Sequence, residues 1–470
     1  MTRTDRLLLV NAMLGQFITG FAARSFVVAL PTISTDLGAD ILAISWALIA
    51  YQIAGISLGI VFGRLGDIHG RYAIYGGGFV VMAVSAFLCG LAPTALWLVI
   101  FRLVEGVGAA MLASATRVLA LEAMPEDAAG RANGFMTMSF HGGVLLGPPV
   151  GGLVIDVVSW RWIFFLLVPI GIAGVVLTAV RGRERRAGPA GRRPAIDYVG
   201  AVLLVVLTVV LVVLLDRRAG EMVGAAGKGV LAAAFVAALA GFLAHERRTP
   251  DPVVNFALFR IRVFVASVVS LLGIAISNSA LMLLLPFYMQ GVLGQSASFM
   301  GLVFLSAPIF TITLAPVVGR VTDRIGARIP ASIGVLMTMA AFVVGTSLDV
   351  DSPWTLPAVV MAFTGLGQGF FNTANQTALL GSVPREYRGF ATGMVQTVFG
   401  LGALLGTALG SALLAVLFRY ASGSSAAPSP ADPAAFVFAV NGACVVCLGI
   451  AVIALVASVM RGGANVTPRA

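Results

Sequence analysis

Charged residues are scarce in this sequence. Asp, Glu, Lys and Arg make up 11% of its 470 residues, whereas hydrophobic residues make up 59%, and the mean hydropathy is +1.00. A soluble globular protein of this length must cover its core with polar side chains, and this sequence has too few of them. The composition therefore excludes a soluble globule and predicts a protein that lies in a lipid bilayer.

Lysine is almost absent, since Lys228 is the only one among the 30 basic residues. A phosphate-binding loop of the Gly-x-x-x-x-Gly-Lys-Ser/Thr type is missing, so we do not expect ATP hydrolysis to drive the protein. Neither a catalytic triad nor a metal-ligand cluster nor a hydrophilic domain stands out in the sequence. We therefore expect no enzymatic activity, no cofactor and no bound metal.

Only three cysteines occur, Cys89, Cys444 and Cys447, and each lies inside an apolar run. A thiol in such a run behaves as a small hydrophobic group, and a metal ion there would be poorly solvated. We therefore interpret the Cys444-x-x-Cys447 spacing as helix packing rather than as a redox or metal site.

Apolar runs long enough to cross a bilayer dominate the rest of the sequence. A membrane helix needs about 20 apolar residues. The sequence predicts fourteen such helices, at 8–30, 43–62, 73–91, 95–121, 132–154, 162–180, 198–215, 228–245, 264–290, 297–318, 330–347, 355–380, 389–418 and 435–459.

The arginines indicate the direction in which these helices run, because cytoplasmic loops carry an excess of Arg and Lys close to the membrane. If the N-terminus is inside, the bias toward the cytoplasm is about four to one. The basic residues on the outer side are then only Arg161, Arg217, Arg218, Lys228 and Arg419. We expect both termini in the cytoplasm, and no binding of nucleic acid, since the net charge of +10 is spread over short loops.

The longest basic connection, at 181–195, follows the sixth predicted helix, and two plainly apolar helices come next. The simplest organisation is an N-terminal six-helix bundle at 1–182, a basic cytoplasmic linker with two inserted, lipid-facing helices at 183–249, and a C-terminal six-helix bundle at 250–470. The predicted fold class is therefore an all-α integral membrane protein with fourteen transmembrane helices, arranged as two pseudo-symmetric six-helix bundles plus two inserted helices.

One charged hinge occurs in both predicted bundles. Residues 63–71 read Gly-Arg-Leu-Gly-Asp-Ile-His-Gly-Arg, and residues 319–328 read Gly-Arg-Val-Thr-Asp-Arg-Ile-Gly-Ala-Arg. Each copy follows the second helix of its bundle, and the spacing Gly-Arg-x-x-Asp-x-x-Gly is the same in both. A hinge repeated about half a chain apart indicates a duplicated membrane bundle.

Further patterns carry a family resemblance. Residues 102–108 read Arg-Leu-Val-Glu-Gly-Val-Gly, residues 143–152 read Gly-Val-Leu-Leu-Gly-Pro-Pro-Val-Gly-Gly, and a Trp-Arg-Trp sequence follows at 160–162. Together with the first hinge, they resemble the signatures of the major facilitator superfamily, and specifically of its fourteen-span drug/proton antiporter branch. The resemblance implies a transporter that works by alternating access. The acidic residue usual in the first helix of this branch is missing, because Ala22 stands in its place.

The resemblance implies roles for two groups of residues. The hinge carboxylate is expected to meet the positive N-terminal end of a helix in the opposite bundle, although the hinge charges could serve only to keep the helices from sliding into the lipid. The glycines of the antiporter motif form a bare stripe for close packing, beside a proline kink. The predicted conformational latch comprises Gly63, Arg64, Asp67, Gly70, Arg71 and Asp323, and the antiporter motif comprises Gly143, Gly147, Pro148, Gly151 and Gly152.

Ionisable residues inside the predicted helices are candidates for a substrate or proton pathway, because charges in a bilayer are expensive. Arg24 in the first helix and Arg102 and Glu105 in the fourth lie at similar depths, so we expect the three to form a cluster. The cluster is either a structural ion network or a site for a polar or anionic part of a substrate, with Glu105 changing its protonation. His141 in the fifth helix is a second candidate proton carrier, and hydrogen-bonded packing is its alternative.

The second bundle offers amides instead of charges. One helix carries four of them on one face, which predicts either a polar face toward a cavity or hydrogen bonds between helices. These are Gln368, Asn372, Asn375 and Gln376, and Asn278 and Gln396 from neighbouring helices could join them.

The most direct interpretation is a secondary transporter of the bacterial inner membrane. It exports amphiphilic small molecules, such as drugs or natural products, in exchange for protons, and it is expected to act as a monomer surrounded by membrane lipid. Arg24 and Arg102 favour one alternative, an exporter of an anionic metabolite or lipid-like compound. Another alternative is a non-transporting membrane sensor or assembly partner that has kept the fold.

Overall fold

The computed structural model describes residues 3–124, 129–182, 203–214 in part, 217–246, 256–384, 388–424 and 426–461. Within these ranges the regular structure is helical, and they contain no strand. A helix satisfies its own backbone hydrogen bonds, which a lipid environment requires. The chain divides into two compact units. The first comprises Met1–Leu214, Arg218–Arg248 and Ser296–Gly301, and the second comprises Leu215–Arg217, Thr249–Gln295 and Leu302–Ala470.

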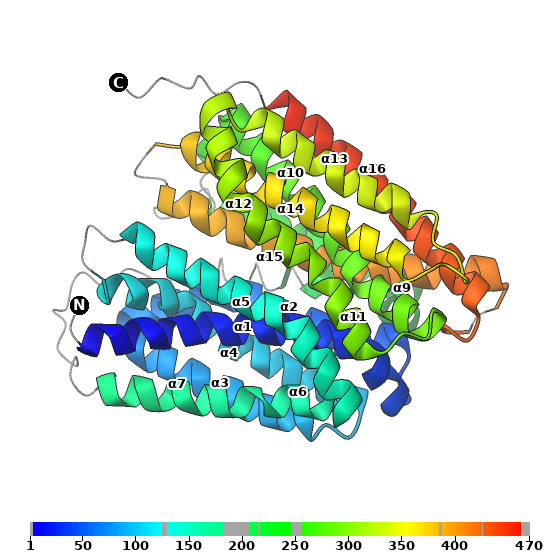
Figure 1. Ribbon diagram of the computed structural model, residues 1–470, viewed down its shortest axis with the longest axis horizontal. Helices are drawn as coiled ribbons and strands as arrows, with labels where there is room; N and C mark the ends of the chain where they lie inside the picture. Colours follow the sequence, from blue (N-terminus) through cyan, green and yellow to red (C-terminus); the bar gives the residue numbers. More distant parts are fainter. Residues whose placement is uncertain are drawn as a thin grey trace. The chain divides into compact units, whose positions relative to one another are not determined.

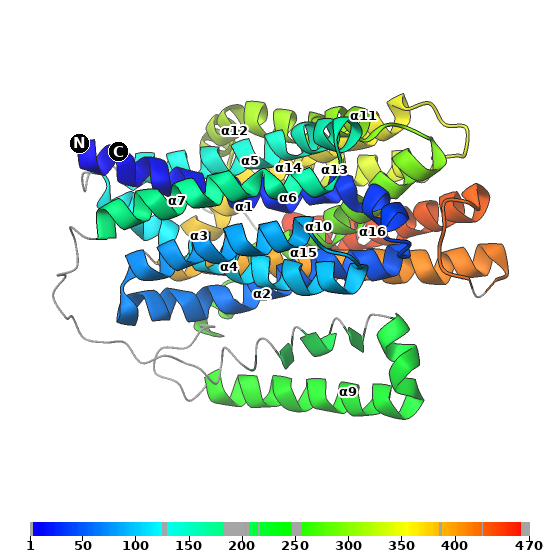
Figure 2. The same ribbon diagram turned by 90° about the horizontal axis from the view of Figure 1, so that it is seen from below.

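The first unit is a bundle of long helices (Figure 1). Its helices are α1 (Arg3–Asp36), α2 (Ile41–His69), α3 (Arg71–Gly90), α4 (Ala95–Glu122), α5 (Ala129–Val157), the short α6 (Arg161–Phe165), α7 (Leu167–Gly182) and α9 (Arg217–Glu246). α1 packs along α5, α4 packs along both α2 and α3, and α7 lies against α3. Figure 2 shows α2, α3 and α4 side by side.

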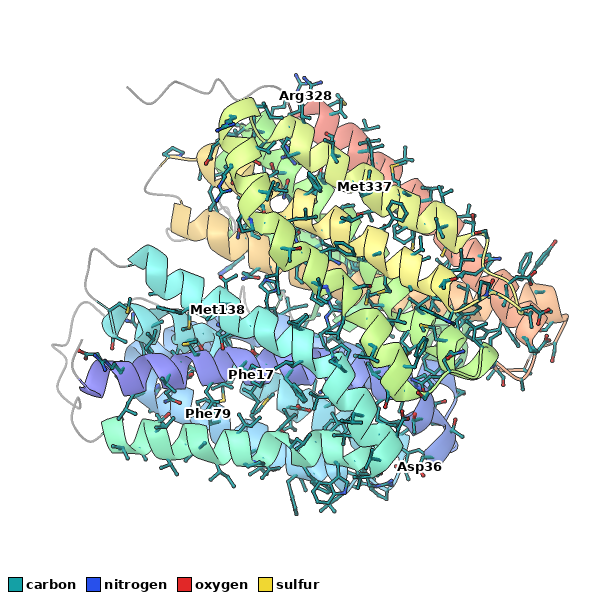
Figure 3. The ribbon with its side chains drawn as sticks, in the orientation of Figure 1. Phe17, Asp36, Phe79, Met138, Arg328 and Met337 are labelled. Carbon is teal, nitrogen blue, oxygen red and sulfur yellow. The ribbon has the colours of Figure 1, made fainter. Side chains whose placement is uncertain are left out.

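Apolar packing and a few polar contacts hold this bundle together. Phe79 of α3 lies fully buried in its core (Figure 3). Beside it, the Tyr75 hydroxyl donates to the carbonyl of Asn11 at 2.8 Å, and the Asn11 amide donates to Thr178 at 2.8 Å. These two hydrogen bonds connect α1, α3 and α7 in a core where an unpaired polar group would be costly.

The second unit repeats this plan. Its helices are α10 (Arg262–Phe287), α12 (Ser306–Ile325), α13 (Arg328–Gly345), α14 (Thr355–Gly381), α15 (Arg388–Ser422) and α16 (Pro433–Met460), and α11 (Ala297–Phe304) begins in the first unit and ends in the second. α10 packs along α15, α14 packs along both α12 and α13, and α16 lies against α13. These are the pairings of α1 with α5, of α4 with α2 and α3, and of α7 with α3. The repeated hinge thus belongs to a repeated packing scheme.

Both hinges turn on a glycine with a positive φ angle. Gly70, between α2 and α3, has φ +96°, and Gly326, between α12 and α13, has φ +81°. Residues with a Cβ atom rarely adopt this conformation, so the last glycine of the hinge pattern has a direct backbone reason. The two hinges are equivalent in geometry as well as in sequence.

Among the described residues, twelve helices are long and apolar enough to cross a membrane. The count of fourteen is not established, for two reasons. The predicted helix at 198–215 lies partly outside the described residues, and the predicted helix at 355–380 forms α14, which is 27 residues long but is not one of the twelve. The predicted helix at 228–245 corresponds to Gly227–His245, of which only 6% is buried inside the protein, and its role as a lipid-facing insertion stays a prediction.

Candidate functional site

A buried ion pair occupies the first unit. α4 carries Arg102 and Glu105 three residues apart, which places them on the same side of the helix. Their side chains are fully buried, and Arg102 Nη1 lies 2.9 Å from Glu105 Oε2. The guanidinium also lies over the rings of Phe26, at 4.3 Å, and Tyr51, at 4.2 Å, which come from α1 and α2. Three helices therefore enclose this charge with an anion and two aromatic faces.

The pair leaves polar atoms without a partner. Among the described residues, Arg102 Nε, Arg102 Nη2 and Glu105 Oε1 are buried and make no hydrogen bond. The thiol of Cys89 lies 3.7 Å from Glu105 Oε2 and acts as a weak donor. Buried polar atoms are normally satisfied, so an incomplete network marks a place where a water molecule or a proton can be accommodated. Glu105 has one oxygen free for protonation.

Arg24 does not belong to this pair, which corrects the predicted cluster of three charges. It has no hydrogen bond or ion pair with any described residue. Two residues correspond to about 200° around a helix, so Arg24 and Phe26 project from opposite sides of α1. Phe26 faces Arg102, whereas the Cβ of Arg24 lies beside Gly147 of α5.

The residue near Arg24 is His141, and not the Arg102–Glu105 pair. It lies on α5, where the Arg24 charge acts on it electrostatically, and its ring meets Phe140 edge-on with the centroids 5.6 Å apart. Both Arg24 and His141 are partly buried. The structure therefore contains two separate groups, the ion pair enclosed by α1, α2 and α4 and the residues Arg24 and His141 where α1 faces α5.

The glycines of the antiporter motif make this approach of α1 and α5 possible. A Cβ on Gly143 would overlap the Phe17 carbonyl oxygen, and a Cβ on Gly147 would lie 3.0 Å from the Ser25 backbone nitrogen. One on Gly151 would lie 3.2 Å from the Ser25 Cβ. These glycines form one packing seam against α1, as the four-residue spacing predicts.

Gly152 and Pro148 contact a different segment. A Cβ on Gly152 would overlap the carbonyl oxygen of Ala297, and one on Gly301 would overlap the carbonyl oxygen of Pro148. Residues 296–301 belong to the first unit, so these contacts lie inside it. α5 continues through Pro148 and Pro149 as one helix.

A second glycine seam was not predicted. Gly402, Gly406 and Gly410 follow one another at four-residue spacing in α15 and face α10. A Cβ on Gly402 would lie 2.5 Å from the Ala275 Cβ, and one on Gly410 would lie 3.0 Å from the Ala280 Cα. The spacing is visible in the sequence, so the α10–α15 seam could have been found by the same rule as the α1–α5 seam.

The predicted latch is only partly described. Gly63 has open space around it, and the side chains of Arg64 and Asp67 lie outside the described residues. Arg71 lies 3.7 Å from Glu122 of α4, an exposed pair that contributes little stability. Asp323 in the second hinge is exposed. The gating role of these residues stays a prediction.

The predicted amide face of α14 is divided between different surroundings. Asn375 is buried, and its amide donates to the Ser267 carbonyl of α10 at 3.2 Å. Its side-chain oxygen accepts from Arg461 Nη2. Gln368 and Asn372 are partly buried. The remaining candidates are Gln376 and Gln396, both exposed, and Asn278, whose buried side-chain oxygen has no partner among the described residues.

Arg461 was not predicted as an inward-facing residue. It follows the last residue of α16, yet only 2% of it is exposed. Burial lowers the pKa of Arg461 to about 10, so the guanidinium is still charged at neutral pH. Its Nε and Nη1 atoms have no partner among the described residues. The contact with Asn375 therefore connects α10, α14 and α16 around a poorly compensated charge.

This arrangement predicts unequal effects on stability for substitutions of Asn375 and Arg461. Asn375→Leu leaves Arg461 charged and buried without its amide partner, so we expect the free energy of unfolding to fall by about 2–3 kcal/mol. Arg461→Met removes the charge itself and should be close to neutral, and the double variant should recover most of the loss. Denaturation of the purified protein in detergent measures this, with Gln376→Leu on the exposed side of α14 as the matched control. An equal loss in both single variants would contradict the assignment.

Two carboxylates tie helix ends together in the first unit. Asp36 ends α1 and accepts from Trp160 Nε1 at 2.8 Å and from Arg161 Nη1 at 2.7 Å (Figure 3). Asp156, near the end of α5, accepts from the backbone N–H groups of Ala297 at 3.3 Å and Ser298 at 2.7 Å. A carboxylate at the start of α11 is stabilised by the unpaired N–H groups there.

Comparison with known proteins agrees with this architecture. The model of the Major Facilitator Superfamily matches residues 12–272 and 263–460. The uncharacterized transporter YebQ of Escherichia coli (strain K12) is 30% identical over 445 residues, which cover 94% of this chain and 92% of YebQ. The multidrug transporter protein MdtP of Bacillus subtilis (strain 168) is 26% identical over 414 residues, which cover 87% of this chain and 75% of MdtP.

A solved structure shows the same fold. A bacterial homologue of the human lysosomal transporter Spinster, in an inward-facing and unoccupied conformation, superposes with a TM-score of 0.71 at 14% identity. The match covers 98% of this chain and 97% of that one. With the family model matching nearly the whole chain and the packing scheme present in both units, this multi-pass membrane protein belongs to the major facilitator superfamily.

Proposed function

We propose that this protein exports an amphiphilic small molecule by alternating access, in exchange for protons. The observation that carries the proposal is the Arg102–Glu105 pair, a carboxylate buried in a membrane helix with one oxygen unpartnered among the described residues. Ionisable groups in membrane helices are expensive and mark ion or substrate pathways. The relative MdtP is a multidrug transporter, which supports the choice of cargo class.

Glu105 is suited to carry the proton. When it is ionised, it neutralises Arg102, and when it is protonated, the guanidinium keeps only the two aromatic faces of Phe26 and Tyr51. Protonation therefore changes the net charge inside the bundle by one unit. A buried charge of this kind favours one conformation over another by a free energy of several kcal/mol, which is enough to couple proton uptake to a conformational change.

The same proposal includes the membrane topology. Fourteen helices, with both termini in the cytoplasm, account for the distribution of arginine along the chain. α9 and α14 supply the eighth and twelfth spans. We place the protein in the cytoplasmic membrane as a monomer, with lipid around α9.

Flux measurements test this function. We expect proteoliposomes that contain the purified protein to move at least one of three probes, namely ethidium, a neutral pyrene alcohol and pyrenebutyrate, when a pH gradient is imposed. The rate should rise about tenfold over the rate without a gradient, because the imposed pH gradient supplies about 1.4 kcal/mol per pH unit and per proton exchanged. Protein-free liposomes provide the background.

Each alternative has its own outcome in this experiment. Flux that is independent of the gradient would indicate a facilitator and would contradict the antiport. Flux of pyrenebutyrate alone would favour an exporter of anionic compounds, which the unpaired Arg24 also favours. A complete lack of flux, with all three probes, would favour the non-transporting membrane sensor.

A further inference from the structure

Among the described arginines of the first unit that are at least partly buried, Arg24 stands out because no carboxylate compensates its charge. Arg71, Arg102 and Arg161 each have a carboxylate within 4 Å, at 3.7, 2.9 and 2.7 Å. Arg24 has no ion pair or hydrogen bond with any residue in the part of the chain that the structure describes. The nearby titratable group is His141, which is itself a base.

The depth of Arg24 makes this lack of a partner costly. Arg24 precedes Asp36, the last residue of α1, by twelve residues, or about 18 Å along the helix axis. The apolar core of a bilayer is about 30 Å thick, so Arg24 lies near its middle. A charge at this depth costs several kcal/mol unless a counter-charge is supplied. The described residues supply none, and Arg24 is only partly buried, so its side chain is open to an anion that would supply the missing counter-charge.

Two aromatic residues share the side of α1 that carries Arg24. Phe17, Phe21 and Arg24 are spaced by four and three residues and therefore lie on one side of the helix. The rings of Phe17 and Phe21 stack with their centroids 6.0 Å apart, and Phe140 lies next to His141 on α5. Phe21 is buried in the core, whereas Phe17 and Phe140 are partly exposed, and these two rings suit a molecule with an acidic group and an apolar or aromatic body.

We propose that Arg24, with His141 beside it, binds the acidic group of the exported substrate, so that the cargo is an amphiphilic organic acid. The proposal rests on the export function proposed above and names its substrate class. A lipid phosphate is the other source of such an anion. Lipid headgroups lie at the membrane surface, however, about 15 Å from the middle of the bilayer, which favours a small molecule at Arg24.

A matched pair of probes tests this assignment. The full-length protein in phosphatidylcholine nanodiscs is titrated with pyrenebutyrate and with its neutral amide, which differ only in the charge, and the signal of empty nanodiscs is subtracted. We expect the acid to bind at least about tenfold more tightly than the amide, or 1.4 kcal/mol. Arg24→Gln should abolish this preference without changing the affinity for the amide, and Arg24→Lys should keep part of it. Arg419→Gln, at an exposed position near the end of α15, is the control.

The outcomes separate this inference from the proposed function. Equal affinity of the wild-type protein for acid and amide overturns it, as does a preference that survives Arg24→Gln. If phosphatidylglycerol in the nanodiscs displaces the acid from the wild-type protein, a lipid phosphate is the preferred ligand of Arg24, which overturns the assignment to a small acid. Gradient-driven flux of ethidium without any preference for the acid leaves the export function intact and rejects this substrate class. A preference for the acid without any flux supports the binding of an organic acid at Arg24 and rejects the export function. If Arg24→Gln does not fold, the inference is tested by the preference of the wild-type protein for the acid and by the smaller preference expected for Arg24→Lys.

Discussion

Replacing Glu105 by Gln is expected to remove the dependence of transport on the pH gradient. Gln can still accept a hydrogen bond from Arg102 but cannot bind and release a proton, so gradient-driven flux should fall about tenfold or more, to the rate seen without a gradient. Probe binding at equilibrium should change little, since the ion pair lies on a different side of α1 from Arg24. Flux into proteoliposomes with and without an imposed gradient is the measurement.

Stability has to be separated from coupling in this experiment. Glu105→Gln leaves Arg102 as an uncompensated buried charge, which costs about 3–5 kcal/mol of the free energy of unfolding. The double variant Arg102→Met with Glu105→Met removes both charges from the same site, and such replacements are typically neutral or stabilising. We expect the double variant to be stable but uncoupled. If Glu105→Gln retained the full response to the gradient, another residue would carry the proton, and His141 would be the next candidate.

Gly143→Val is expected to disrupt the first unit, whereas Gly142→Val is not. A Cβ on Gly143 would overlap the Phe17 carbonyl oxygen and come within 2.7 Å of the Phe21 nitrogen, both backbone atoms of α1. Gly142, one residue earlier in α5, has nothing within 4 Å of the corresponding position. Overpacking of this kind costs about 1–3 kcal/mol, and it would also move α1 and Arg24 away from α5.

The two valine variants control for each other. They share the helix, the residue type and the loss of a glycine, so the cost of a β-branched side chain in a helix cancels between them. Thermal unfolding in detergent should show a lower midpoint for Gly143→Val only, and flux should follow the same order. Equal midpoints would mean that the α1–α5 contact is loose enough to accept a side chain, and the packing seam would then be wrong.

Several features of this protein are local enough to be read from sequence. Long apolar runs predict the helices because a bilayer requires a minimum length of apolar surface. The four-residue spacing of Gly143, Gly147 and Gly151 predicts a bare seam because successive residues at this spacing lie on one side of a helix. Arg102 and Glu105 are three residues apart, so their ion pair is also a local property.

α14 is predicted at 355–380 from its length, but it is less apolar than the twelve helices that qualify as membrane spans. This helix carries Gln368, Asn372, Asn375 and Gln376, and such amides lower the hydropathy of a helix that the bundle surrounds on several sides. α14 packs against α10, α12, α13 and α15. A helix in such surroundings needs less apolar surface than one that faces lipid. The contacts with neighbouring helices therefore explain why α14 can carry amides.

The predicted cluster of Arg24, Arg102 and Glu105 shows where sequence reasoning stops. Depth along a helix follows from residue number, and it placed the three residues at one level. Rotation about the helix axis and the identity of the neighbouring helix do not follow from it, and α1 turns Phe26 toward Arg102 and Arg24 toward α5. Two residues at the same depth can therefore lie in different environments.

The sequence alone was enough for the membrane setting, the positions of most helices, the repeated hinge and the glycine seam, because each depends on residues close together in the chain. The partners of the buried charges depended on the folded structure. Arg461 meets Asn375 across 86 residues, and Arg161 meets Asp36 across 125. Contacts at such separations depend on which helices pack together and on how each is rotated, and many different pairings satisfy the same hydropathy pattern. Packing of small residues against the neighbouring backbone selects one of them, and that selection leaves Arg24 without a carboxylate among the described residues.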